Sequence, residues 1–276
     1  MFQYIYGQAL KERFNKKVLY DLTWYNMDSS HRYRELENHE SYRLKAFGIE
    51  PEMISEKTSN FFNSKLGKVY NLIQQQWFKW GLRPVMPTYF LGYWNGEPYF
   101  ENIKESVTNI YELPTLTNEN ALKYKAMMES GPPAVSMHIR RGDYKNHAHL
   151  QVCTPEYYQA AMDHLKTKLD DFCVFVFSDD IDYCKEILGK HQNIVFIENC
   201  GTDLDEFQLM THCQHHVVSN STFSWWTAWL AENRYKDGRM VLTPPHWYKN
   251  PENFSQQLRY IDLNKIIPDR WTKISF

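Results

Sequence analysis

Short apolar runs alternate with helical patterns along the second half of the chain. From about residue 130 onward, segments whose apolar residues recur with the period of an α-helix separate five such runs. The predicted strands are Ala134–Ile139, Cys173–Phe177, Ile194–Ile197, His216–Ser219 and Met240–Leu242. Strands that alternate with helices of this length predict βαβ units and a parallel sheet, which is an α/β fold.

Helix boundary signals lie between these runs. Thr154-Pro155 places a capping residue before a proline at the first helical position. Asp179-Asp180 can cap the next helix, for which Gly189 is a natural stop. Thr202 to Asp205 resembles a capping box at the start of a third helix.

The first half of the chain gives weaker patterns. Helices are predicted over Phe2–Phe14, Lys65–Trp80 and Ile103–Tyr111, and a strand over Lys17–Leu22. Gly131-Pro132-Pro133 is a natural linker. We therefore expect a domain boundary near residue 130, with one domain over residues 1–130 and another over 131–276.

One apolar face in the first half has two interpretations. It carries Leu72, Ile73, Trp77, Phe78 and Trp80. Such a face could touch a membrane surface, but packing in a core is the preferred interpretation.

Composition narrows the class of protein. The 276 residues are 43% hydrophobic and 23% charged, with a net charge of -2. This balance argues against broad nucleic-acid binding. The five cysteines are odd in number and scattered, and no signal peptide or membrane-spanning run is found. We expect a cytoplasmic protein with at most peripheral contact at the inner face of the membrane.

The most informative motif follows the apolar run Ala134-Val135-Ser136-Met137, which begins the first of the predicted strands. It is His138-Ile139-Arg140-Arg141-Gly142-Asp143-Tyr144. Open parallel sheets bind ligands at the carboxyl ends of their strands, and arginine presents paired donors to phosphate oxygens. An isolated Arg-Arg pair is as often an ordinary solvated loop, so the motif needs support from elsewhere in the chain.

A second motif supplies that support. The strand His216–Ser219 runs directly into Asn220-Ser221-Thr222-Phe223, which opens a helix rich in hydroxyl groups at its start. The free N–H groups of a helix N-terminus favour anions. Alone, the segment fits equally well an ordinary helix cap followed by core aromatic residues. Together, the two motifs could hold a pyrophosphate.

At these residues the chain resembles the bacterial α-1,2-fucosyltransferases of glycosyltransferase family 11. The motifs that match are His138–Tyr144, Phe177-Ser178-Asp179-Asp180, Asp205…Leu209-Met210…Cys213 and Asn220–Ala228, together with Gly92-Tyr93-Trp94…Tyr99-Phe100 and Met1-Phe2-Gln3-Tyr4…Gly7…Ala9-Leu10. In the family, a short strand and a Gly-Gly-Leu-Gly-Asn-Gln turn precede the last of these. We therefore expect the first strand and the Gly-rich turn to be missing from this sequence. The alternative is then a non-catalytic protein that binds GDP-sugars or glycans.

The resemblance implies a GT-B-type α/β architecture. Two Rossmann-like domains would face a cleft, with an acceptor-side domain over 1–130 and a GDP-sugar-binding domain over 131–276. The implied reaction transfers L-fucose from GDP-β-L-fucose to a galactose 2-hydroxyl with inversion. The acceptor would be a galactose-containing oligosaccharide or a lipid-linked glycan. No cofactor is implied beyond the donor substrate.

The resemblance also implies roles for individual residues. Arg140 would contact the pyrophosphate, with Arg141 the weaker candidate. The helix terminus, with Asn220 leading into it, would cradle the phosphates through Ser221, Thr222 and Phe223. Removing Arg140 should cost about 2–4 kcal/mol of transition-state stabilisation.

The acid–base roles stay open in the sequence. Asp143 and His138 lie near the sheet mouth and could deprotonate the acceptor, although Asp143 could equally orient Arg140 or cap the turn. Asp179, Asp180 and Asp205 could read guanine or ribose, but helix capping fits each of them equally well.

We expect no metal. Asp180-Ile181-Asp182 and Asp203-Leu204-Asp205 have the Asp-x-Asp form of metal-dependent transferases. Both are predicted to lie in first helical turns, where acidic residues are favoured anyway. The arginines can neutralise phosphate charge without a metal.

Overall fold

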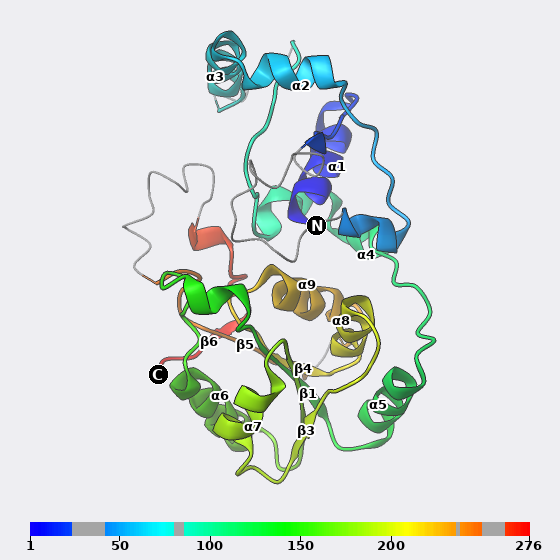
Figure 1. Ribbon diagram of the computed structural model, residues 1–276, viewed down its shortest axis with the longest axis vertical. Helices are drawn as coiled ribbons and strands as arrows, with labels where there is room; N and C mark the ends of the chain where they lie inside the picture. Colours follow the sequence, from blue (N-terminus) through cyan, green and yellow to red (C-terminus); the bar gives the residue numbers. More distant parts are fainter. Residues whose placement is uncertain (24–41, 80–85, 236–237, 250–262) are drawn as a thin grey trace. The chain divides into compact units, whose positions relative to one another are not determined.

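The computed structural model describes residues 1–23, 42–79, 86–235, 238–249 and 263–276 (Figure 1). The chain forms two compact units, one mainly of Met1–Tyr111 and the other mainly of Glu112–Gln257 with Ile266–Phe276. The division therefore falls before the expected boundary near residue 130.

Packing of α5 (Glu119–Ser130) explains the earlier division. Its residues Ala121 and Met128 lie in one apolar cluster with Ala134 and Phe175, which belong to strands of the second unit. The linker at residues 131–133 thus joins a helix and a strand of the same unit.

A parallel six-stranded sheet forms the centre of the second unit. Its strands are β1 (Ala134–Ile139), β2 (Cys173–Ser178), β3 (Ile194–Phe196), β4 (His215–Val217), β5 (Val241–Thr243) and β6 (Thr272–Lys273). Besides α5, the second unit contains the helices α6 (Pro155–Lys168), α7 (Ile181–Leu188), α8 (Asp203–Thr211) and α9 (Thr222–Ala231). The α/β class and the five predicted strands are confirmed. The prediction omitted β6, which consists of two exposed residues and has no apolar pattern.

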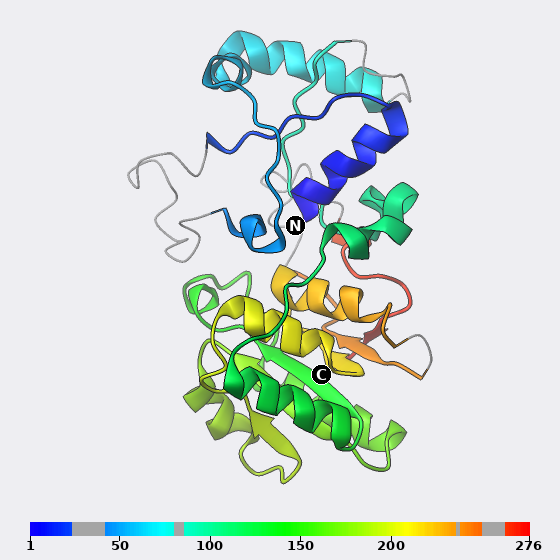
Figure 2. The ribbon, with the colours of Figure 1, turned by 90° about the vertical axis from the view of Figure 1, so that its right-hand side faces the viewer.

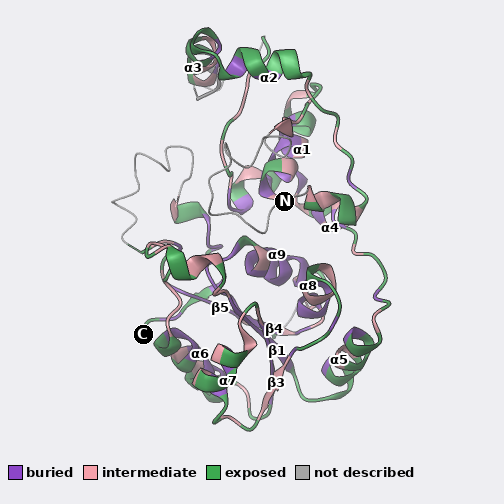
Figure 3. Ribbon diagram, in the orientation of Figure 1, coloured by how far each residue is buried: buried purple, intermediate pink, exposed green. Residues whose placement is uncertain are grey.

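Helices cover both faces of this sheet (Figure 2). Alternate strand side chains point to opposite faces. Val135 and Met137 of β1 join a cluster with α6 and α7, whereas Phe175 of β2 joins one with α5 and α8. All six residues of β1 are buried (Figure 3). A strand buried on both faces reads as a continuous apolar run, which is why the sequence predicted it.

The strand order decides where a ligand can bind. The order β3-β2-β1-β4-β5-β6 is that of a Rossmann-type sheet. Successive strands are added outward on one side of β1 up to β3 and then on its other side from β4, so the topological switch point lies between β1 and β4. In open α/β sheets, ligands bind outside the carboxyl ends of the strands at such a switch point, so we expect a ligand site beyond β1 and β4.

All three predicted helix starts are confirmed. Thr154 is the N-cap of α6, and Asp180 caps α7 by accepting a hydrogen bond from the Tyr183 N–H. Thr202 and Asp205 form the capping box of α8.

The first unit is mainly helical in its described residues. It contains α1 (Phe2–Phe14), α2 (Glu56–Asn63), α3 (Lys65–Lys79), α4 (Val107–Ile110) and the 3-10 helices η2 (Arg43–Phe47), η3 (Glu97–Tyr99) and η4 (Glu101–Ser106). The predictions of α1 and α3 are confirmed. The helix predicted over Ile103–Tyr111 is instead divided between η4 and α4, with non-helical backbone at Ile103.

The strand predicted over Lys17–Leu22 is reduced to one isolated bridge between Tyr20 and Met53. Two backbone hydrogen bonds hold it, from Tyr20 N to Glu52 O at 2.8 Å and from Ile54 N to Tyr20 O at 3.1 Å. Two bonds do not make a ladder. Within its described residues, the first unit therefore does not display the second Rossmann-like sheet that the sequence led us to expect.

None of the helices in the described segments combines the length and the apolar character that crossing a membrane requires.

Candidate functional site

The two predicted phosphate motifs meet at the switch point of the sheet. His138 is the next-to-last residue of β1, and its Nδ1 lies 2.9 Å from the Ser219 hydroxyl oxygen in the loop after β4. The His138 ring lies 5.5 Å from the ring of Phe223, in the first turn of α9. The Tyr144 hydroxyl, from the loop after β1, donates a hydrogen bond to Asn220 O at 3.0 Å. Three contacts thus join the motif His138–Tyr144, whose residues 140–144 we call the arginine loop, to the segment that opens α9.

Arg140 is held between two carboxylates. Its Nε and Nη2 donate to Oδ1 of Asp143 at 3.0 Å and 2.8 Å, and its Nη1 lies 2.9 Å from Oδ2 of Asp179. A guanidinium carries five N–H donors. One hydrogen remains on each of its two terminal nitrogens, in a plane fixed by the two carboxylates.

Asp179 shapes the arginine loop. Its Oδ1 and Oδ2 accept hydrogen bonds from the backbone N–H groups of Arg141 at 2.8 Å and Gly142 at 3.0 Å. A Cβ at position 142 would come within 2.6 Å of Asp179 Oδ2, so only glycine allows this approach. These contacts favour a positioning role for Asp179 over a direct contact with guanine or ribose.

Arg141 faces α7 and not α9. Its guanidinium lies 3.7 Å from the centre of the Tyr183 ring, and its Nε lies 3.6 Å from Asp180 Oδ2. Lys145 approaches the same carboxylate oxygen at 2.6 Å. Asp180 is therefore occupied as a helix cap and as the partner of two cations. Lys145 directly follows the motif in the sequence and was not predicted as a site residue.

Charge in the arginine loop is balanced. Three cations, Arg140, Arg141 and Lys145, lie against three carboxylates, Asp143, Asp179 and Asp180. An anion at this place would be attracted by directed N–H donors more than by net positive charge.

The start of α9 offers such donors. Its N-cap residue Ser221 makes no capping hydrogen bond through its side chain. The first N–H groups of a helix have no partner within the helix. Ser221 is buried, Thr222 is exposed, and Phe223 packs edge-on against Phe207 of α8 at 5.2 Å. These three residues lie where the sequence predicted a phosphate cradle.

Asn220 has a different environment from the one expected. Its side-chain nitrogen donates to Leu150 O at 2.9 Å and to Trp247 O at 3.0 Å. Both donors of the amide are thereby used to hold neighbouring loops together. This arrangement favours a structural role for the Asn220 side chain.

Asp205 is likewise engaged locally. Its Oδ2 accepts hydrogen bonds from the backbone N–H of Thr202 at 2.7 Å and from the Thr202 hydroxyl at 2.8 Å. This is the capping role that the sequence allowed, and a contact with the nucleotide stays a prediction.

Burial controls the protonation of His138. It lowers the pKa of the imidazole to about 4, with a further decrease from the nearby Arg140 cation and a smaller opposing effect of Asp179. The ring is therefore neutral at pH 7. A group with so low a pKa is a poor base near neutrality, and its bond to Ser219 suits a positioning role.

Glu206, in the first turn of α8, was not predicted. Burial, followed by the carboxylates of Asp203, Asp179 and Asp205, raises its pKa to about 7. A carboxyl with this pKa could exchange a proton near neutral pH. The sequence could have indicated Glu206 only as one of the acidic residues in the first turn of α8.

Both Asp-x-Asp segments lie in first helical turns, as expected: Asp180 caps α7 and Asp205 caps α8. In the described part of the chain, no group of three or more His, Cys, Asp and Glu side chains is arranged to hold a metal ion.

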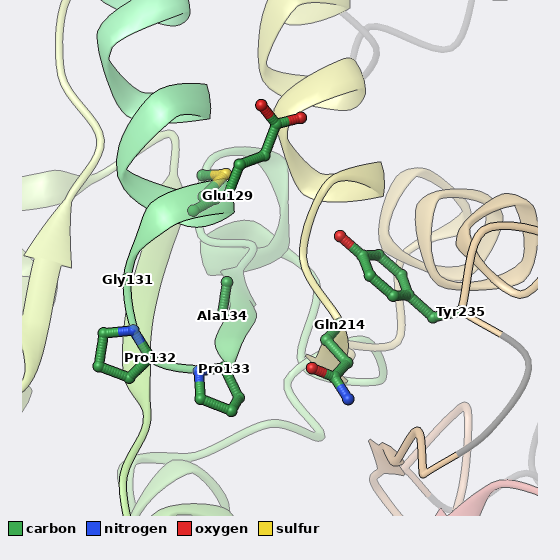
Figure 4. A pocket seen from close by; sticks show the side chains of 8 residues that line it. Glu129, Gly131, Pro132, Pro133, Ala134, Gln214 and Tyr235 are labelled. Atoms are coloured by element: carbon green, nitrogen blue, oxygen red, sulfur yellow. The ribbon is translucent and has the colours of Figure 1, made fainter.

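A pocket at the other end of β1 lies away from these residues (Figure 4). Its lining comprises Met128, Glu129, Gly131, Pro132, Pro133, Ala134, Gln214 and Tyr235. Ala134 is the first residue of β1, so this pocket lies at the amino ends of the strands, where parallel sheets do not usually bind ligands.

Comparison with known proteins gives a consistent family. The sequence model of the family Glycosyl transferase family 11 matches residues 43–260 of this chain. An alpha-1,2-colitosyltransferase of Escherichia coli is 28% identical over 99% of this chain and 94% of its own. Galactoside alpha-(1,2)-fucosyltransferase 1 of Rattus norvegicus is 30% identical over 48% of this chain and 39% of its own. Among solved structures, NodZ alpha-1,6-fucosyltransferase soaked with GDP-fucose aligns with a TM-score of 0.44 and 14% identity, over 83% of this chain and 87% of that one.

Proposed function

Since the chain belongs to glycosyl transferase family 11, we propose that it transfers a 6-deoxyhexose from a GDP-linked donor to a galactose 2-hydroxyl, with inversion. We assign L-fucose, from GDP-β-L-fucose, as the transferred sugar. The acceptor is a galactose-containing oligosaccharide or a lipid-linked glycan.

One observation carries the proposal: Arg140 and the uncapped start of α9 share the switch point of a Rossmann-type sheet. A pyrophosphate placed there would receive the two remaining donors of Arg140 and the backbone N–H groups of the first α9 turn. In our proposal, Ser221, Thr222 and Phe223 form that turn of the cradle.

The arrangement suits the chemistry of the leaving group. Inversion proceeds by one in-line displacement through an oxocarbenium-like state, while negative charge develops on the departing GDP. Donors that are fixed before the reaction stabilise that charge without reorganising. Asp143 and Asp179 hold the Arg140 plane in advance, which is how they would contribute to the rate.

We assign to Asp143 the role of the base that deprotonates the acceptor hydroxyl. Both of its contacts with Arg140 use Oδ1, so that Oδ2 can face the acceptor. Glu206 is the second candidate on account of its raised pKa. Arginine and helix donors can neutralise the pyrophosphate, so the proposed reaction needs no metal.

The relatives suggest GDP-colitose as an alternative donor. Colitose is fucose without its 3-hydroxyl group, and the relative that aligns over nearly the whole chain is named for colitose. A site that hydrogen-bonds a hydroxyl strongly rejects an analogue lacking it, whereas a site without such a bond discriminates weakly. The two donors therefore need a direct comparison.

The architecture proposed for the whole chain is of GT-B type, with the donor bound by the second unit and the acceptor by the first. The second unit supports its part through the Rossmann-type strand order.

The decisive experiment compares donors and arginines together. Purified protein is given GDP-fucose or GDP-colitose with a β-galactoside, the products are identified by NMR, and GDP affinity is measured by calorimetry. Arg140→Lys keeps the charge but loses the fork, and should lower kcat/KM about 30- to 1000-fold. Arg141→Lys is the matched control, because Arg141 faces α7, and should change kcat/KM far less.

Each outcome has a distinct meaning. Fucose transfer with the linkage at the 2-hydroxyl supports the proposal, and preferential use of GDP-colitose replaces the donor assignment. GDP binding without any transfer would favour the non-catalytic binding protein. Absence of both GDP binding and transfer would refute the sugar-nucleotide function.

A further inference from the structure

Helix α3 exposes its apolar face and turns its polar face toward its own unit. A helix at a protein surface normally buries its apolar stripe and exposes its polar one. The side chain of Asn71 instead faces the unit and forms two hydrogen bonds with the backbone of Tyr89, at 2.6 Å and 2.8 Å. Gln75 donates to Tyr89 O at 3.0 Å, and Gln74 is buried. Amide side chains thus attach α3 to its own unit.

The apolar residues of α3 face outward. Leu66 is 73% exposed, Val69 57%, Leu72 61% and Ile73 51%. Figure 3 shows exposed residues along α3. Leu66, Val69 and Ile73 occupy positions i, i+3 and i+7 of one helical face, and Leu72 lies beside them. We call these four residues the α3 apolar patch. The preferred sequence interpretation, core packing, is therefore wrong for Leu72 and Ile73; the side chains of Trp77, Phe78 and Trp80 lie outside the described residues.

Positive charge borders the α3 apolar patch. Lys65 and Lys68 are exposed on α3, and each lies one or two turns from Leu72 on the helix surface. The segment Lys65–Lys79 contains no Asp or Glu. An apolar face edged by lysines, without acidic residues, is the pattern of helices that lie in the interface of an anionic bilayer.

We propose that the α3 apolar patch docks this protein on the surface of an anionic lipid bilayer. The helix would lie in the plane of the interface, with the four apolar side chains among the acyl chains and the lysines at the phosphate level. The lysine stems can extend along the apolar region while their ammonium groups reach the phosphates.

A second copy of the chain fits this surface less well. A stable protein interface uses about 20–30 residues on each side, and lysine is depleted from its centre. The α3 apolar patch offers four apolar side chains on one helix, with lysines next to them. A bilayer accepts a patch of this size because lipids adapt to its shape and supply the negative charge.

The test is co-sedimentation of the full chain with vesicles. Vesicles of phosphatidylcholine with phosphatidylglycerol are compared with vesicles of phosphatidylcholine alone. We expect binding to the anionic vesicles that weakens with added salt. The double variant Leu66→Gln/Ile73→Gln should lower the partition coefficient about tenfold or more, because both side chains lose their transfer into the bilayer. Lys65→Gln/Lys68→Gln should lower binding and its salt dependence together.

Leu122→Gln is the matched control, since Leu122 is an exposed leucine on α5. It should bind vesicles as the wild type does. Circular dichroism checks that each variant is folded, and transfer to a soluble acceptor should be unchanged in all of them.

Failure of the wild type to bind anionic vesicles would overturn the proposal, as would equal binding by the Leu66→Gln/Ile73→Gln variant. Sedimentation of the wild type as a dimer that this variant converts to a monomer would also overturn it, in favour of a second copy of the chain. These outcomes do not depend on which sugar the protein transfers.

Discussion

His138 and Ser219 join the ends of β1 and β4 at the switch point of the sheet, with 2.9 Å between Nδ1 and Oγ. Both side chains are buried, so the bond is shielded from water. It ties the strand that delivers Arg140 to the loop that opens α9.

Ser219→Ala should therefore destabilise the protein. The substitution leaves the buried His138 Nδ1 without its partner, which costs about 1–3 kcal/mol of the free energy of unfolding. We also expect weaker GDP binding, because the two motifs are no longer held together. Urea unfolding and calorimetry measure these effects. Ser130→Ala, at the exposed end of α5, is the control. Equal stability of the two variants would show that the bond contributes nothing.

Asp179→Asn should reduce activity without removing any group assigned to touch the substrate. It weakens the hold on Arg140 and the fit of the loop around Gly142. A displaced catalytic group commonly lowers the rate, here by about 10- to 100-fold in kcat/KM. Asp182→Asn, at an exposed position on α7, is the matched control. Steady-state kinetics with both variants decide whether Asp179 acts on Arg140 or only stabilises the fold.

Two variants can separate the predicted contact of Asp205 with the nucleotide from its role in capping α8. Thr202→Ala breaks the capping box and should cost about 1 kcal/mol of stability. Asp205→Asn weakens the same cap, and we expect it also to lower GDP affinity about tenfold, whereas Thr202→Ala should not. If calorimetry gives the same affinity for both variants, Asp205 is only a cap.

Stability should decrease as the solution becomes acidic. Burial lowers the pKa of His138 and His215 to about 4, and that of His216 well below its ordinary value. In the unfolded chain these imidazoles take up protons near pH 6.5, so between pH 6.5 and 4 the unfolded state binds more protons. The free energy of unfolding should therefore fall through this window, by on the order of 2 kcal/mol for each of His138 and His215. Urea unfolding at pH 7 and at pH 4.5 tests this, and His215→Asn should flatten the profile.

Glu206 should have the opposite dependence. Its pKa is raised to about 7 from the ordinary 4.5, so the folded protein holds this proton more tightly than the unfolded chain. The resulting contribution to stability is present below pH 4.5 and is lost as the pH rises to 7. Glu206→Gln should thus stabilise the protein at pH 8, by about 1–3 kcal/mol, and have little effect at pH 4.5. Glu186→Gln, at an exposed position, is the control; a stabilisation that does not vary with pH would contradict the assignment.

Local patterns predicted the second unit well. β1 is buried on both faces, so its apolar run was visible without knowledge of its neighbours. The caps at Thr154, Asp180 and Thr202 were equally visible, because a cap depends on residues within one turn of the helix.

The first half of the chain was harder to predict because its elements depend on distant partners. The segment around Tyr20 has a strand-like sequence, but it pairs with residues 52–54 through one bridge only. α5 was missed as a helix, and its packing through Ala121 and Met128 assigns it to the second unit.

The chain's own sequence determined where the candidate site residues lie: in the arginine motif after a buried strand and at the hydroxyl-rich start of α9. Only the tertiary structure decided what each side chain faces. It directed Arg140 to Asp143 and Asp179, turned Arg141 toward Tyr183, used the Asn220 amide to hold two loops, and left the α3 apolar patch exposed. The physical reason is that strand formation and capping are set by neighbours in sequence, whereas hydrogen-bond partners and burial are set by residues that only folding brings together.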